Sequence, residues 1–206
     1  MNNQEEIWDN EYKKDDNKWK KENIFLPNMM KYKDVLELGV GNGKTLASIL
    51  KQNPKSVTAI DFSQEAIDIC KVKIRNNSVS LIKSDIKCLP FRRETFDVIV
   101  CYYILNNLKE KEREEAVKEI KRVLKNSGTI IFEDFAVNDF RQKVGKIIEI
   151  NTIEKKSGLI QHFFTKDELF NLFKDSSQIQ LKEKTFLPFK NKKDILRKII
   201  FGTIKK

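Results

Sequence analysis

The chain has 206 residues, of which 40% are hydrophobic and 34% are charged, and its formal net charge at pH 7 is +10. This length suits one globular domain with a buried core. No apolar run reaches the roughly 18 residues typical of a membrane-spanning helix, and the polar N-terminus does not resemble a signal peptide, so we expect no membrane association and a cytoplasmic location. Three cysteines without a C-x-x-C pair and a single histidine predict neither a disulfide framework nor a metal site.

The first thirty residues place large aromatic side chains, among them Trp8, Tyr12 and Trp19, between charged residues. Such a pattern predicts one or two amphipathic helices ahead of the first strand. These aromatics either cover an edge of the sheet or close over a bound ligand. We take residues 1–30 as a helical lid, with Tyr12 and Trp19 as candidates for substrate contact.

A short apolar strand then runs into a glycine-rich turn in the stretch VLELGVGNGK, residues 35–44. Glycines at 39, 41 and 43 allow backbone dihedrals that a Cβ forbids, and the helix that follows directs unpaired N–H groups at the same point. The spacing is G-x-G-x-G, not the G-x-G-x-x-G of dinucleotide sites. Glu37, just before the turn, suits an ammonium group better than a phosphate, which favours S-adenosylmethionine (SAM) over a pyrophosphate cofactor.

Strands and helices alternate after this turn. Helices are expected at residues 44–52, after Ser63 as a cap, and at 109–125, where Asn107 and Glu110 have capping-box spacing. Strands are expected at 56–60, 79–84, 96–101 and 129–132. This order predicts a doubly wound α/β sheet that binds its ligand at the carboxyl ends of the strands.

Acidic residues stand at two of those strand ends. Asp61 follows the second strand, where a carboxylate can accept hydrogen bonds from both ribose hydroxyls; the alternative is a helix cap. Phe62 can pack on adenine, and Asp85, after the third strand, can accept from the exocyclic amine of adenine. Asp61 and Asp85 occur in the same chain as the glycine turn, and this combination favours SAM over a dinucleotide as the cofactor.

From Ala136 to Phe164 the pattern loosens, as is common in lids and binding regions, so we expect residues 136–164 to contact substrate. Thr165 and Glu168 have capping-box spacing before a short helix, and residues 179–184 and 199–204 are expected to be strands. Residues 182–206 are strongly basic, which fits either a solvated surface or a face for nucleic acid.

Four segments between Val35 and Phe135 resemble the successive motifs of class I SAM-dependent methyltransferases, specifically the type 11 group: LELGVGNGK, AIDFS, KSDIKCLPFRRETFDVIVCYYILNNL and EIKRVLKNSGTIIFED. The resemblance implies a single domain, residues 1–206, built on a doubly wound, seven-stranded, mostly parallel sheet whose last strand is antiparallel. It also implies the following cofactor contacts: Glu37, Gly39, Gly41 and Gly43 around the methionine part, Asp61 and Phe62 at ribose and adenine, Asp85 and Ile86 at the adenine edge, and Cys101 near the methionine backbone.

Methyl transfer from SAM, which leaves S-adenosylhomocysteine, chiefly requires a nucleophile held in line with the methyl carbon, so a base is optional. Candidates for contact with the acceptor near the mouth of the site are Tyr103, Asn107, Glu133 and His162. For His162 the alternative is a packed residue at a helix start. Many relatives have two histidines where this chain has Asn106 and Asn107, which argues against proton transfer there.

The expected activity is methyl transfer to an oxygen or nitrogen of a small molecule, because the chain shows no recognisable RNA-binding module. A tRNA methyltransferase is the alternative, since the basic residues near the end of the chain suit RNA. A third interpretation is a SAM-binding partner subunit without catalysis. The sequence does not predict the oligomeric state.

Overall fold

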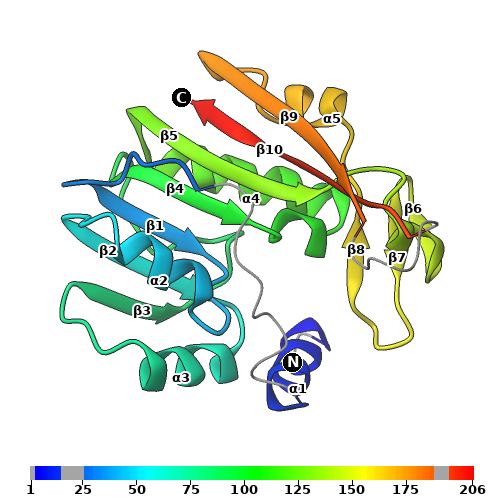
Figure 1. The fold of residues 1–206 in the computed structure, drawn as a ribbon, viewed down its shortest axis with the longest axis horizontal. Coiled ribbons are helices and arrows are strands. Elements are labelled where there is room, and N and C mark those ends of the chain that lie inside the picture. Colours follow the sequence, from blue (N-terminus) through cyan, green and yellow to red (C-terminus); the bar gives the residue numbers. More distant parts are fainter. Residues whose placement is uncertain (1–2, 15–25, 188–194) are drawn as a thin grey trace.

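The computed structural model describes residues 3–14, 26–187 and 195–206 (Figure 1). Trp19, predicted to contact substrate, lies outside these residues, as do several of the basic residues between 188 and 194. The N-terminal helix α1 (Asn3–Lys14) is within the description.

A seven-stranded sheet with the order β3-β2-β1-β4-β5-β10-β9 forms the centre of the molecule (Figure 1). Its strands are β1 (Asp34–Leu38), β2 (Ser56–Asp61), β3 (Val79–Lys83), β4 (Phe96–Tyr102), β5 (Leu124–Phe135), β9 (Gln178–Phe186) and β10 (Arg197–Lys205). The first five are parallel, whereas β10 is antiparallel to both β5 and β9. The predicted doubly wound, mostly parallel sheet with an antiparallel last strand is confirmed.

Helices cover both faces of this sheet because alternate strand residues point to opposite sides. Val35 packs with Leu46 of α2 (Lys44–Leu50) and Ile67 of α3 (Gln64–Lys73). Leu36 packs instead with residues of α4 (Glu110–Val123) and α5 (Lys166–Leu172). Two buried clusters, one on each face, therefore fix the strands whose carboxyl ends form the site.

A second, three-stranded sheet follows β5. It is reached through the 3-10 turn η2 (Phe140–Lys143), and its strands are β6 (Lys146–Glu149), β7 (Thr152–Glu154) and β8 (Ile160–His162). The chain leaving β8 joins the end of β5, where Phe164 N donates to Phe135 O at 2.8 Å and Val137 N donates to Phe164 O at 3.1 Å. The segment 136–164 is thus an antiparallel sheet anchored beside the carboxyl ends of the main strands.

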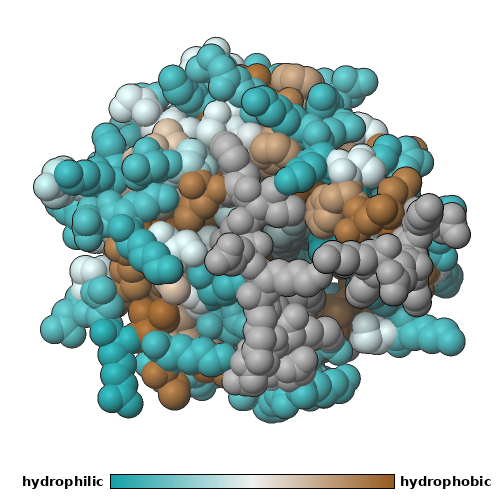
Figure 2. Space-filling view, viewed as in Figure 1, coloured by the Kyte–Doolittle hydropathy of each residue, from teal (hydrophilic) through white to brown (hydrophobic). Residues whose placement is uncertain are grey.

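The surface of the small sheet carries exposed apolar side chains, Val144, Ile147 and Ile150. Figure 2 shows hydrophobic side chains on the right of a mostly hydrophilic face, where Figure 1 places this sheet. Among the described residues, no helix is long and apolar enough to cross a membrane.

Two predicted helix caps are confirmed: Ser63 Oγ accepts from Ala66 N at 3.1 Å, and Thr165 Oγ1 accepts from Glu168 N at 3.1 Å. The cap predicted at Asn107 is wrong. Asn107 ends a 3-10 turn, η1 (Leu105–Asn107), and its Nδ2 donates to Tyr103 O at 2.9 Å. The start of α4 is capped by Glu112, whose Oε2 accepts from Lys109 N at 3.0 Å.

Candidate cofactor and acceptor site

The glycine turn between β1 and α2 has the backbone that its sequence predicts. Gly39, Gly41 and Gly43 have φ values of 69°, 51° and 80°, in the left-handed region that favours glycine. A Cβ on Gly39 would lie 1.8 Å from Ile104 Cδ1, and one on Gly41 would lie 2.8 Å from Tyr12 Oη. The three glycines therefore allow close approach of other groups to the backbone at this turn.

Glu37 lies on β1 just before the turn and is buried. Among the described residues, its Oε2 has no hydrogen-bond partner. Burial raises the pKa of Glu37 well above its ordinary value, and the charge of Asp61 adds to the shift, while Lys44 opposes it. A buried carboxylate oxygen without a donor is unfavourable, and the ammonium group of a bound amino acid would supply one. This residue fits the methionine part of SAM.

Asp61 joins the end of β2 to the glycine turn. Its Oδ2 accepts from Gly41 N at 2.8 Å and its Oδ1 accepts from Ser63 N at 3.0 Å. The cap of α3 is Ser63 itself, so the alternative interpretation of Asp61 as the helix cap is not what the geometry shows. Burial raises the pKa of Asp61 to about 6, and the backbone N–H donors limit the rise.

The other predicted cofactor residues follow neighbouring strands. Phe62 is half-buried after β2, and Asp85 follows β3, where its Oδ1 accepts from Lys87 N at 2.9 Å. Ile86 is buried beside Leu105 on the α4 side of the sheet. The side chain of Cys101 is buried in the same cluster, and burial raises the pKa of its thiol, so that it stays protonated at neutral pH. Only the backbone of Cys101, next to β1, is available to the glycine turn.

Helix α1 bridges the cofactor turns and the small sheet. Tyr12 is buried against Gly41, and Asp9 Oδ1 accepts from Ser63 Oγ and from Glu65 N. At its other end, Gln4 Nε2 donates to Gly158 O at 3.0 Å in the turn before β8. The helix thus lies against both sides of the candidate site.

Tyr103, Asn107 and Glu133 are brought together where β4 and β5 end. The Tyr103 hydroxyl donates to Glu133 Oε1 at 2.6 Å, and Asn107 holds the Tyr103 carbonyl. Tyr103 has a φ of 54°, an unusual value for an aromatic residue and one that is often found at functional sites. The charges of Glu133 and Glu37 both act on Lys44, the first residue of α2. The acceptor candidates therefore adjoin the methionine end of the predicted cofactor site.

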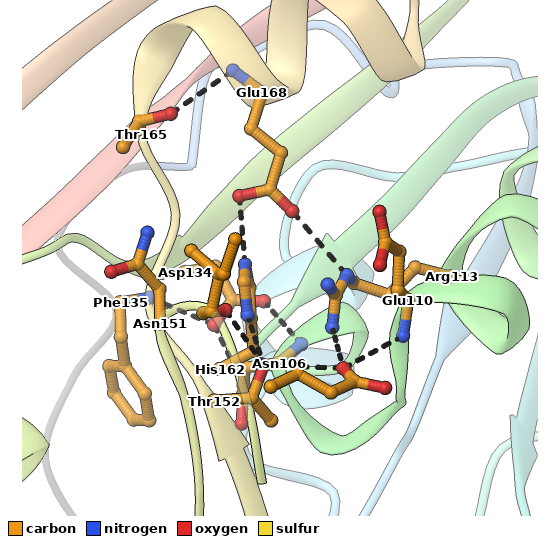
Figure 3. A network of polar contacts seen from close by, with 12 residues as sticks. Asn106, Glu110, Arg113, Asp134, Phe135, Asn151, Thr152, His162, Thr165 and Glu168 are labelled. Atoms are coloured by element: carbon orange, nitrogen blue, oxygen red, sulfur yellow. Dashed lines mark hydrogen bonds and ion pairs between the residues drawn. The ribbon is translucent and has the colours of Figure 1, made fainter. Parts of the chain in front are cut away.

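His162 belongs instead to a buried polar network between β7, β8, α4 and α5 (Figure 3). Its Nδ1 lies 2.8 Å from Thr152 Oγ1 and its Nε2 lies 2.8 Å from Glu168 Oε2. Arg113 of α4 is buried and its Nε lies 3.5 Å from Glu168 Oε1. Both ring nitrogens are engaged within the protein, so the geometry favours the packed interpretation of His162, although it ends a strand and does not start a helix.

Several residues of the site escape sequence reasoning. Lys44 is at the cofactor turn, Gln161 is buried on β8, and the guanidinium of Arg141 lies 3.6 Å from the ring centre of Phe135. Arg141 is held there by two contacts to Asp139, at 2.7 and 2.9 Å. A signal did exist for Arg113, since it shares the apolar face of α4 with Ala116, Val117 and Ile120. In the described parts of the chain, no group of three or more potential ligands could hold a metal ion.

Comparisons with known proteins find similarity to methyltransferases. A family model described as "Methyltransferase domain" matches residues 36–132. The tRNA N(3)-methylcytidine methyltransferase of Schizosaccharomyces pombe is 29% identical over 154 residues, which cover 68% of this chain and 50% of that protein. The demethylmenaquinone methyltransferase of Chlamydia pneumoniae is 36% identical over 97 residues, or 47% of this chain and 41% of that protein. The chain thus spans half or less of the length of these curated relatives.

The fold is shared with solved structures. A SAM-dependent methyltransferase from Methanosarcina mazei superposes with a TM-score of 0.72 at 23% identity, over 86% of this chain and 94% of that one. The family match covers β1 to β5 and so includes the glycine turn, Asp61 and Asp85. The glycine turn and the two aspartates in this segment are the residues described above as suited to SAM. Residues 36–132 therefore match a methyltransferase domain, the chain has the fold of SAM-dependent methyltransferases, and its glycine turn, Glu37 and Asp61 fit SAM as the cofactor.

Proposed function

We propose that this chain transfers the methyl group of SAM to a ring nitrogen of a nucleobase in tRNA, with N3 of cytidine as the first candidate. The observation that carries the proposal is the extent of the matches. The match to the tRNA enzyme of S. pombe covers 68% of the chain, a larger share than residues 36–132 make up. The match to the demethylmenaquinone enzyme covers 47%, about as much as that family segment.

This difference matters because the segment from β1 to β5 contains the cofactor turns, which methyltransferases with unrelated acceptors share. Residues outside that segment are the ones expected to select the acceptor. Similarity that continues beyond it therefore supports a common acceptor class more strongly than a higher identity confined to it. The tRNA alternative accordingly replaces the small molecule as our first choice.

In the proposed reaction, Glu37 and the glycine turn would hold the methionine part of SAM, Asp61 and Phe62 its ribose and adenine, and Asp85 and Ile86 the adenine edge. The backbone of Cys101 would lie beside the methionine part. When bound, SAM supplies a methyl group on a sulfonium, which is already a good leaving group. The work of the chain is to position the acceptor and exclude water. We infer that α1 contributes to that exclusion, because Tyr12 lies against Gly41.

A small-molecule acceptor remains the second candidate, favoured by the 36% identity to the demethylmenaquinone enzyme. Tritiated SAM, unmodified tRNA transcripts and nucleoside chromatography test the two. We expect label in one methylated cytidine, reduced at least tenfold by Asp61→Ala and unchanged by the exposed control Asp68→Ala. Label that never enters tRNA would contradict the proposal.

Charge offers an independent measurement. RNA binding that releases counterions weakens with salt at a slope of roughly −0.7 to −0.9 per phosphate contact in a logarithmic plot. Arg197 and Lys198 of β10, together with Lys190, Lys192 and Lys193 outside the described residues, are the predicted contacts. Changing all five to Gln should flatten the slope for tRNA. An unaltered slope would remove this surface from the proposal.

A further inference from the structure

Three aromatic rings form a cluster where β5 and β8 meet. The ring centres of Tyr103 and Phe135 are 4.9 Å apart, and those of Phe135 and Phe163 are 6.0 Å apart. Glu133 stands two residues before Phe135 on β5, and Gln161 stands two residues before Phe163. Residues two apart in a strand share a face. A carboxylate and a carboxamide therefore flank this cluster from two different sheets.

Gln161 has an unused acceptor. The residue is 7% exposed, and its Oε1 is buried without a hydrogen-bond partner in the described chain. Its cross-strand neighbour, Ile153, packs with Phe135 and Phe163, which places the carboxamide at the edge of the aromatic cluster. A buried carbonyl oxygen without a donor is unfavourable. Its presence here points to a ligand that brings an N–H or O–H group.

Glu133 is held rigidly on the other flank. It is 1% exposed, and Oε1 accepts the Tyr103 hydroxyl at 2.6 Å. A carboxylate can accept hydrogen bonds from several donors at once, so a ligand N–H can share this group with the contacts that Glu133 makes within the protein. Burial raises the pKa of Tyr103, with the charge of Glu133 adding to the shift, so the phenol remains a donor at neutral pH.

We propose that Glu133 and Gln161 bind the exocyclic amino group of the acceptor base, a proposal that rests on the function proposed above. Tyr103 is the positioning residue for the Glu133 carboxylate. An amino group has two N–H donors, which two acceptors satisfy. A carboxylate that accepts from the amine of cytosine is an established mode of base recognition. Uracil carries a carbonyl oxygen at the same place, which would face the acceptor-only carboxylate of Glu133 with no hydrogen between the two oxygens.

The same arrangement suits the electron flow. The lone pair of the cytosine ring nitrogen forms the new bond to the methyl carbon, while the electron pair of the breaking C–S bond returns to sulfur. Positive charge moves from the sulfonium to the pyrimidine, and no proton leaves. The Glu133 carboxylate beside the amino group stabilises that charge as it develops.

The test compares Glu133→Gln and Gln161→Leu with two exposed controls, Glu154→Gln and Gln180→Leu. Transfer from tritiated SAM to tRNA transcripts is measured together with SAM affinity by calorimetry and thermal melting. We expect Glu133→Gln and Gln161→Leu each to lower kcat/KM at least tenfold, while SAM affinity stays within twofold and the melting temperature within 3 °C of the unmodified protein. Tyr103→Phe should lower kcat/KM less than Glu133→Gln does, because the charge of the Glu133 carboxylate remains. The controls should stay within twofold in kcat/KM.

Unchanged transfer in these two variants, or transfer and SAM affinity lost in parallel, would overturn the assignment. If the unmodified protein methylates no tRNA, the function proposed above fails, and base binding by Glu133 and Gln161 is tested separately. Calorimetry with S-adenosylhomocysteine present then compares cytidine 5′-monophosphate with uridine 5′-monophosphate. A preference of tenfold or more for the cytidine nucleotide that Glu133→Gln abolishes would support the roles proposed for Glu133 and Gln161. Equal binding, or no binding of either at millimolar concentration, would overturn it.

Discussion

Lowering the pH should weaken SAM binding through Asp61. The pKa of this carboxyl is raised from 3.8 to about 6 by burial, a shift of roughly two units that corresponds to about 3 kcal/mol between its two protonation states. At pH 7 the group is mostly ionised and can accept the ribose hydroxyls together with Gly41 N and Ser63 N. At pH 5 it is mostly protonated. If only the ionised form binds, affinity falls about tenfold between these two values.

Calorimetric titration of SAM at half-unit steps from pH 5 to pH 8 measures this directly. Asp61→Asn should bind weakly at every pH and should lose the transition near pH 6. Glu37→Gln is the necessary control, because burial raises the pKa of Glu37 as well; it should weaken binding but keep that transition. A dissociation constant that does not change between pH 5 and pH 7, or a transition that survives in Asp61→Asn, would refute the role given to Asp61.

Three further outcomes are expected. Deleting residues 1–14 should leave a cooperative thermal melt but weaken SAM binding at least tenfold, because Tyr12 no longer covers the glycine turn; normal affinity would exclude a lid role for α1. His162→Ala should lower the free energy of unfolding in urea by about 2–4 kcal/mol, since it removes a buried ring together with its hydrogen bonds to Thr152 and to the half-buried Glu168, whereas the exposed control Lys156→Ala should change it by less than about 0.5 kcal/mol. Burial raises the pKa of Asp134 to about 7, so stability should fall as the pH rises from about 4 to about 7, and melts of Asp134→Asn over that range should show a smaller fall.

The cofactor half of the fold is predictable because its signals are local. The glycine spacing specifies a backbone, and the apolar runs at β1, β2 and β4 are long enough to be recognised as strands. The small sheet could not be recognised in the same way. Its strands β7 and β8 have three residues each, too few for a period of two to differ from chance. The chain leaving β8 is held by hydrogen bonds to the end of β5, which is remote in sequence.

The candidate acceptor residues show the same limit. Asn107 has the right spacing for a helix cap, but the bond from its amide to Tyr103 O competes with capping and leaves Glu112 to cap α4. Gln161 carries no sequence signal at all, because a glutamine between an isoleucine and a histidine is ordinary in an exposed strand. Its burial arises only when the strand that contains it lies against the aromatic residues at the end of β5.

The position of β10 affects how the chain is made. Strand β9, residues 178–186, leaves the ribosome before β10, residues 197–205, yet β10 lies between β9 and β5 in the sheet. During synthesis β9 consequently has no partner, and the outer edge of β5 stays open until the last of these residues emerges. An open strand edge can pair with other chains. Ribosome-bound chains ending before residue 197 should therefore depend on chaperones that shield such edges, and that dependence should end once residue 205 is free.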